Sequence, residues 1–126
     1  MPMPENAKKV FEGVIFDVYQ WEQKMYDGST QTFERLDRAD TVDVLATTKQ
    51  GKILVQRQSQ PDRDESFLCL IGGRVEKGED ILDAAKREMF EETGYTSQEW
   101  ELLLSYQPTH KIRWDMYVYV ARHCEK

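Results

Sequence analysis

The stretch from Gly73 to Tyr95 constrains the fold of this 126-residue chain more strongly than any other. It begins in a glycine-rich loop, which suits a backbone that turns sharply or lies close to a ligand. Its apolar side chains then recur at helical spacing, at Ile81, Leu82, Ala85 and Met89. Asp80 is suited to cap the start of a helix, and Gly94 to end it in the left-handed conformation. We therefore predict a loop followed by a helix over about residues 80–93.

Three glutamates lie on one face of this predicted helix. Glu88, Glu91 and Glu92 are separated by three or four positions, so their carboxylates cluster. Two carboxylates about 4 Å apart repel by roughly 4 kcal/mol at an effective dielectric constant near 20. Acids in the last turn also oppose the helix dipole. A hard divalent cation that takes oxygen ligands, with Mg²⁺ as the first choice and Mn²⁺ as the second, would offset this repulsion.

For an isolated acidic cluster, a solvent-exposed helix face paired with Lys86 and Arg87 is the simpler interpretation. The spacing of residues over the whole stretch from Gly73 to Tyr95 favours a functional interpretation instead. It follows the pattern G-x5-E-x7-R-E-U-x-E-E-x-G-U, where U is a bulky aliphatic residue. The residues at the fixed positions are Gly73, Glu79, Arg87, Glu88, Glu91, Glu92 and Gly94. This pattern resembles the box of the Nudix hydrolase family. Met89 occupies the first U, and Tyr95 departs from the aliphatic residue at the last.

The resemblance implies an α+β fold, a Nudix-type α/β/α sandwich around a mixed sheet, with the box as a loop and helix at about 72–94. The order of elements before the box resembles the branch of ADP-ribose pyrophosphatases and nucleotide-sugar hydrolases. The family usually places a second helix after the last strand. The short polar segment 122–126 does not supply one, so we expect the usual C-terminal helix to be missing.

The activity implied by the resemblance is metal-dependent hydrolysis of the pyrophosphate bond in a nucleotide sugar or ADP-ribose. The products would be a nucleoside monophosphate and a sugar phosphate. The ligands implied for Mg²⁺ or Mn²⁺ are the carbonyl of Gly72 and the carboxylates of Glu88, Glu91 and Glu92. Arg87 would complete the catalytic set by holding the glutamates in position. Gly73, Glu79 and Gly94 would be structural, with Glu79 tying the loop to the helix.

The general base stays open among Glu88, Glu91, Asp115 and His110. A histidine in a polar loop is often only exposed, and strand alternation alone can turn an aspartate outward.

Candidate substrate contacts are an aromatic residue that can stack a base and arginines that can bind phosphates: Trp21, Arg38, Arg57 and Arg63. Aromatic residues on strands more often belong to the core, and each arginine can equally be a surface charge.

The exact substrate and two other functions stay open. Cys69 and Ile71 depart from the acid and the proline common in the pyrophosphatase branch, so the substrate can be a nucleotide sugar other than ADP-ribose. A house-cleaning hydrolase of oxidised nucleoside triphosphates differs only in substrate, and the N-terminal segment weighs against it. A non-catalytic nucleotide-binding Nudix module has no reason to keep three mutually repelling glutamates, so the intact acidic set favours the enzyme.

Composition narrows the class of partner. A net charge of −6 argues against binding along a nucleic-acid backbone and leaves a small nucleotide bridged by metal. No apolar run is long enough for a membrane span, and Met1–Glu5 lacks the apolar region of a signal peptide. We expect one domain over 1–126, located in the cytoplasm, without nucleic-acid or membrane partners.

The remaining chain reads as strands, with residues 1–8 flexible. The predicted strand regions are 9–25, 31–38, 41–48, 52–58, 67–71, 100–107 and 114–121. Asp27-Gly28 predicts a hairpin, so 9–38 forms an antiparallel ribbon. This ribbon carries more apolar residues than it can bury on itself. We therefore expect it to form the interface of a homodimer, as in relatives of the pyrophosphatase branch.

Overall fold

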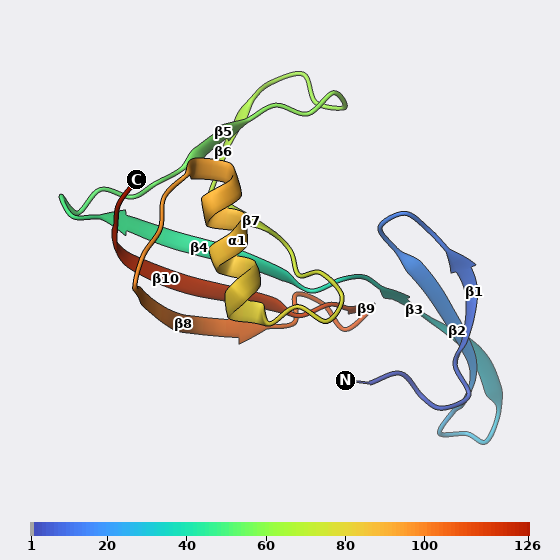
Figure 1. Cartoon of the computed structure of the whole chain (residues 1–126). Coiled ribbons are helices and arrows are strands. Elements are labelled where there is room, and N and C mark those ends of the chain that lie inside the picture. The colour runs from blue at the N-terminus through green and yellow to red at the C-terminus, as the bar shows by residue number, and fades with distance from the viewer. Residues whose placement is uncertain (1) are drawn as a thin grey trace. The chain divides into compact units, whose positions relative to one another are not determined.

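Figure 1 shows the computed structural model, which describes residues 2–126 in two compact units. The first unit comprises the described residues up to Ala39 together with Gln107–Asp115. The second comprises Asp40–Tyr106 and Met116–Lys126. No helix in the described residues is long and apolar enough to cross a membrane.

The first unit is a sheet in the order β1-β2-β3-β9. Its strands are β1 (Lys8–Glu12), β2 (Asp17–Lys24), β3 (Thr30–Asp37) and β9 (Ile112–Arg113). Strand β2 pairs antiparallel with both β1 and β3, and β9 runs parallel to β3. Asp27 and Gly28 form the turn between β2 and β3, where the aspartate accepts a hydrogen bond from the backbone N–H of Ser29 at 2.9 Å. The predicted antiparallel ribbon is therefore confirmed.

The second unit is built on a mixed sheet in the order β7-β4-β10-β8. Its strands are β7 (Ile71–Arg74), β4 (Thr41–Thr48), β10 (Met116–Cys124) and β8 (Glu99–Tyr106). Strand β4 is antiparallel to β7 and parallel to β10, and β10 is antiparallel to β8. A separate hairpin joins β5 (Gln56–Gln58) to β6 (Phe67–Cys69) and extends from this unit (Figure 1).

The helix α1 (Ile81–Thr93) packs on β7, β4 and β10 (Figure 1). Asp80 caps its start by accepting a hydrogen bond from the N–H of Asp83, and Gly94 ends it at φ 74°. Alternate residues of β4 face it, and the core comprises Val42, Val44, Ala46, Ile71, Ala84, Ala85, Met89, Ala121 and Cys124. The α+β class with a mixed sheet is confirmed, and α1 is the only α-helix in residues 2–126.

Three strand predictions need correction. The region 67–71 is divided between β6 and β7, which belong to different sheets. The region 52–58 is a strand only at 56–58, and Ile53 makes a single bridge to Thr47, because the preceding residues still belong to the turn after β4. The last strand begins at Met116 rather than Trp114 and extends to Cys124, because β10 is central and pairs along both edges. The sequence analysis missed β9, which is too short to show alternation.

Candidate active site

Arg87 lies at the centre of the charged cluster on α1. Its Nε and Nη2 donate to the two carboxylate oxygens of Glu79 at 2.8 and 3.0 Å, a two-point contact of fixed geometry. Nη2 also donates to the carbonyl of Arg74 at 3.1 Å, and Glu79 accepts from the N–H of Glu76 at 3.1 Å. One guanidinium therefore joins the helix to both ends of the preceding loop.

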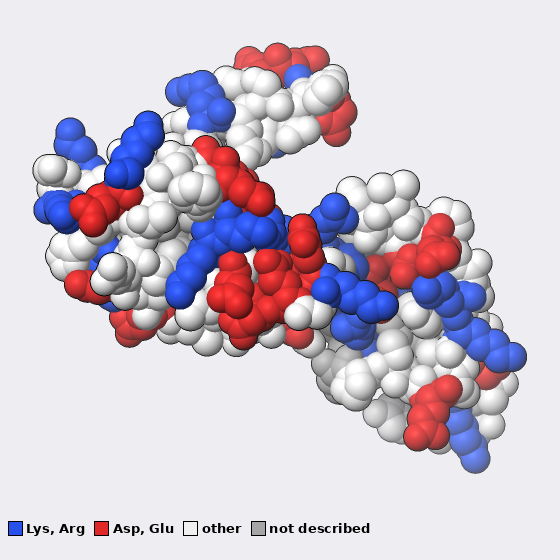
Figure 2. All heavy atoms as spheres, in the orientation of Figure 1, with Lys and Arg blue, Asp and Glu red and all other residues white. Residues whose placement is uncertain are grey.

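The same guanidinium reaches two of the three glutamates. Its Nη1 donates to Glu88 at 3.0 Å and to Glu91 at 3.3 Å. The Glu88 side chain is 14% exposed and that of Glu91 is 57% exposed, so the two carboxylates differ in access to solvent. These acidic partners, Glu79 first, raise the pKa of Arg87 above its ordinary value. Figure 2 shows acidic and basic side chains intermingled on the face that carries α1.

The two glycines before the loop allow the backbone to approach these acids. A Cβ on Gly73 would lie 2.4 Å from the Glu88 carboxylate, so the glutamate occupies the space that a side chain would fill. A Cβ on Gly72 would lie 2.4 Å from the backbone carbonyl oxygen of Val42, which has no freedom to rotate away. Gly72 is therefore required by fixed backbone, whereas a side chain at Gly73 would displace the Glu88 carboxylate from this position.

Glu92 has a different environment from the other two glutamates. Its Oε2 accepts hydrogen bonds from the N–H of Gly72 at 3.3 Å and from Nε2 of Gln56 at 2.9 Å. Burial raises the pKa of Glu92, and the charges of Glu88 and Glu91 raise it further, whereas the two hydrogen bonds oppose that shift. Uncharged donors, not Arg87, hold this carboxylate.

Two polar residues near the glutamates, Asp43 and Gln56, were not predicted from the sequence. Asp43 pairs with Gly72 across β4 and β7, and burial raises the pKa of its carboxyl. Burial also raises the pKa of the Cys69 thiol, as do the nearby charges of Glu92 and Asp43, which disfavours the reactive thiolate. A polar residue between Val42 and Val44 is the one signal that marks Asp43 in the sequence. Gln56 has no comparable signal.

The oxygen atoms of three carboxylates and of the Gly72 carbonyl are available near the C-terminal end of α1. Oxygen ligands of this kind are chemically suited to a hard divalent cation. Within residues 2–126, no three acidic, histidine or cysteine side chains converge on one point as placed. Glu88 and Glu91 instead accept hydrogen bonds from Arg87. A cation would therefore compete with Arg87 for these two carboxylates.

Two of the predicted substrate-binding arginines lie on the β5–β6 hairpin of the same unit. Arg57 donates to the hydroxyl of Ser66 at 3.3 Å, which closes the hairpin. The guanidinium of Arg63 lies 3.9 Å from the centre of the Phe67 ring. Both contacts are local to the hairpin, so a role in phosphate binding stays a prediction.

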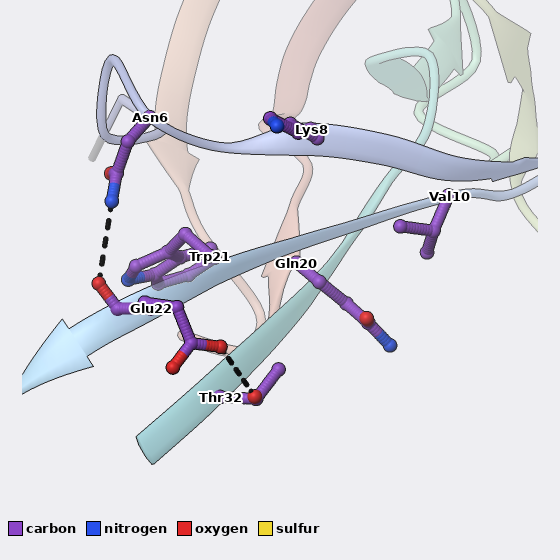
Figure 3. Close-up of a pocket in the computed structure, with 7 residues that line it drawn as sticks. All are labelled: Asn6, Lys8, Val10, Gln20, Trp21, Glu22 and Thr32. Carbon is purple, nitrogen blue, oxygen red and sulfur yellow. Dashed lines mark hydrogen bonds between the residues drawn. The ribbon is translucent and has the colours of Figure 1, made fainter. Parts of the chain in front are cut away.

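Trp21 and His110 lie in the first unit. The Trp21 ring packs edge-on against Phe33 with centroids 6.0 Å apart, and the Arg35 guanidinium lies 5.4 Å from its centre. Arg35 in turn donates to Nε2 of His110 at 3.2 Å. Trp21 and Gln20 are among the residues that line a hollow of about 400 Å³. Figure 3 shows these side chains. The indole is mostly buried in this packing, and base stacking by Trp21 stays a prediction.

Arg38 and Asp115 also lie in the first unit. The Arg38 guanidinium is 4.5 Å from the centre of the Trp114 ring, and its Nε donates to the carbonyl of Ala39 at 3.3 Å. Asp115 directly precedes β10 and is not part of a strand, which corrects the alternation argument made for it. The roles of Arg38, Asp115 and His110 in the reaction stay predictions.

Comparison with known proteins decides the family. Residues 37–126 match the NUDIX domain. The chain belongs to this family. Among curated relatives, an ADP-ribose pyrophosphatase of Bacillus subtilis (strain 168) is 32% identical over 91 residues, which are 72% of this chain and 49% of that protein. A methanol dehydrogenase activator of Bacillus methanolicus is 28% identical over 122 residues, 96% of this chain and 66% of that protein.

A further relative is the ADP-ribose pyrophosphatase of Saccharomyces cerevisiae (strain ATCC 204508 / S288c), 30% identical over 101 residues, 76% of this chain and 42% of that protein. The chain thus spans between 42% and 66% of the length of these relatives. A solved structure described as an ADP compounds hydrolase matches with a TM-score of 0.80 at 19% identity, covering 96% of this chain and 66% of that one. This likeness confirms the Nudix-type fold.

Replacing Glu79 by Gln tests whether the contact with Arg87 joins the loop to the helix. The hydrogen bonds from Arg87 lower the pKa of Glu79. The ionised carboxylate therefore stabilises the fold at pH values above the ordinary pKa of a glutamate. That contribution is lost as the pH falls through the lowered folded-state pKa. We expect Glu79→Gln to be less stable than wild type at neutral pH, with the difference closing in acid. Urea unfolding over a pH series measures this.

The matched control is Glu76→Gln. Glu76 lies in the same loop, but its side chain is 71% exposed and its closest approach to Arg87 is 4.0 Å. We expect this variant to match wild type, since exposed pairs contribute little. Equal stability of the Glu79 and Glu76 variants at neutral pH would contradict a structural role for the Glu79 contact.

Proposed function

We propose that this chain hydrolyses the pyrophosphate bond of a nucleoside diphosphate linked to a second moiety, in a reaction that requires Mg²⁺ or Mn²⁺. The observation that carries the proposal is the set of three carboxylates on α1, held on one side by Arg87 and on the other by Gly72 and Gln56. Mutually repelling acids cost stability. A cation that binds between the three carboxylates would account for their presence together on one helix.

In this reaction Glu88, Glu91 and Glu92, with the carbonyl of Gly72, would hold the cation. When bound, it neutralises negative charge on the phosphate oxygens. The oxygen of a water molecule forms a bond to one phosphorus, and the bond from that phosphorus to the bridging oxygen breaks. The bridging oxygen leaves with the second phosphate. The protons of the water end on the base and the phosphate products.

Within this scheme the protein provides position and charge. Arg87 keeps Glu88 against Gly73 and limits the repulsion between Glu88 and Glu91. The Glu91 side chain is 57% exposed and that of Glu88 only 14%, so Glu91 is more open to a water molecule, which favours it over Glu88 as the base.

Replacing Glu92 by Gln tests the metal dependence. Removing a group that only supports a metal ligand typically costs about 10- to 100-fold, so loss of the ligand itself should reduce turnover by at least about 100-fold. The fold should persist, and the metal-free melting temperature should rise slightly because one repelling charge is gone. Phosphate-product assays at saturating Mg²⁺ measure turnover.

The control is Glu101→Gln. Glu101 lies on β8 and forms an ion pair with Arg122, away from the acidic cluster on α1. Turnover of the Glu92 variant near that of the control would refute the assignment.

The proposed substrates are nucleotide sugars and ADP-ribose. Support comes from the two relatives named ADP-ribose pyrophosphatase, each at least 30% identical over most of this chain. We expect a panel of nucleotide sugars, ADP-ribose, dinucleotides and nucleoside triphosphates to give a nucleoside monophosphate and a sugar phosphate from the preferred compound. Chromatography of the products decides this. Faster cleavage of triphosphates than of every diphosphate sugar would point to a house-cleaning hydrolase, and nucleotide binding without cleavage to a non-catalytic module.

We also propose that the chain forms a homodimer through the ribbon at 9–38. Large apolar side chains are exposed there at Val10, Phe11, Val14, Ile15 and Tyr26, and Val14 is 97% exposed. Such a patch is typical of an interface. We expect light scattering at micromolar concentration to give the mass of two chains. Introducing a charge at Val14 should shift the mass to that of one chain. An active wild-type protein with the mass of one chain would contradict the proposal.

A further inference from the structure

Gln56 connects the β5–β6 hairpin to the acidic cluster. Its Nε2 donates to Oε2 of Glu92 at 2.9 Å, across a separation of 36 residues in the chain. In Figure 1 the hairpin starts beside the C-terminal end of α1, where Glu92 lies. Side chains alternate along a strand, so Gln56 and Gln58 share one face of β5 while Arg57 lies on the other. The strand therefore presents two amides, and no charge, on the side of Glu92.

The orientation of the Gln56 amide follows from its two partners. A glutamine amide can donate from its nitrogen and accept at its oxygen, and an ionised carboxylate can only accept. Gln58 donates from Nε2 to Oε1 of Gln56 at 2.8 Å. The oxygen of Gln56 is thereby used, and its nitrogen is directed to Glu92. The two glutamines form a hydrogen-bond chain with a single direction, from Gln58 through Gln56 to the carboxylate.

Both hydrogen bonds that Glu92 accepts fall on the same oxygen. Gly72 donates its backbone N–H to Oε2 at 3.3 Å, and Gln56 donates to that same atom. The carboxylate is thus held at one oxygen between the box loop and the hairpin. Its other oxygen, Oε1, is left for a cation. A held carboxylate loses less conformational freedom on binding a ligand than a free one, which favours binding.

We propose that Gln56 is a positioning residue, which holds Glu92 ready to bind the divalent cation, and that Gln58 acts through Gln56 by setting the direction of its amide. This inference rests on the proposed function, in which Glu92 is a metal ligand. It adds a residue from the hairpin, outside the box, to the determinants of metal affinity. The groups that orient metal ligands typically contribute about 10- to 100-fold to metal affinity.

A purely structural role for Gln56 makes a different prediction. If the hydrogen bond only docked the hairpin on α1, its loss would lower the melting temperature and leave metal affinity unchanged. If Gln58 contributed independently of Gln56, the two losses would add. A positioning role instead predicts weaker metal binding from either replacement, with no additional loss when both are replaced, because Gln58 acts only through Gln56.

The experiment measures binding of Mn²⁺ alone, without nucleotide, from the electron paramagnetic resonance signal of the free ion. The variants are Gln56→Met, Gln58→Met and the double variant, since methionine keeps the length of glutamine and removes its hydrogen bonds. Gln60→Met is the matched control, the same change on an exposed residue of the hairpin loop. Thermal melting in the absence of metal accompanies each titration.

We expect Gln56→Met to weaken Mn²⁺ binding by about tenfold. We expect Gln58→Met to weaken it by less, the double variant to match Gln56→Met, and Gln60→Met to match wild type. If Gln56→Met bound Mn²⁺ with wild-type affinity, the inference would be overturned and the proposed function would stand. Additive losses of Mn²⁺ affinity in the double variant would have the same consequence. A wild-type chain that binds no Mn²⁺ would overturn both. If Gln56→Met does not fold, the Gln58→Met variant decides the question. A Mn²⁺ affinity equal to that of Gln60→Met would overturn the inference, and a weaker affinity would support it.

Discussion

The two-point contact between Arg87 and Glu79 is the interaction on which the box depends. A guanidinium has donors in a fixed plane, and here they serve Glu79, Glu88, Glu91 and the carbonyl of Arg74 at once. Glu79 belongs to the loop and the other acids to α1, so one side chain determines where the loop meets the helix. The close approach of Glu88 to Gly73 follows from that placement.

The acidic cluster is balanced in two chemically different ways. Glu88 and Glu91 share the positive charge of Arg87, whereas Glu92 accepts from the neutral N–H of Gly72 and the amide of Gln56. Neutral donors support a carboxylate without cancelling its charge. Burial and the neighbouring acids raise the pKa of Glu92, and the hydrogen bonds from these two donors oppose that shift. A cation bound here would compete with Arg87 at two of the acids but not at the third.

Local patterns predicted most elements correctly. The helix and its caps at Asp80 and Gly94 follow from short-range spacing, as does the hairpin at Asp27-Gly28. Prediction failed where tertiary pairing decides length. Strand β10 reaches Cys124 because β4 and β8 flank it, and β5 is confined to 56–58 by its short pairing with β6. No alternation within a two-residue segment such as β9 can reveal a partner far along the chain.

By itself, the sequence determined the family and predicted the charged residues of the candidate site. Glu79, Arg87, Glu88, Glu91 and Glu92 lie within one loop and one helix whose spacing brings them together. Only the tertiary structure decided which groups surround them. Gln56 is 36 residues from Glu92, and Asp43 meets Gly72 through the register of β4 and β7. Sheet register and the docking of a hairpin depend on packing across the whole unit, and no local spacing encodes them.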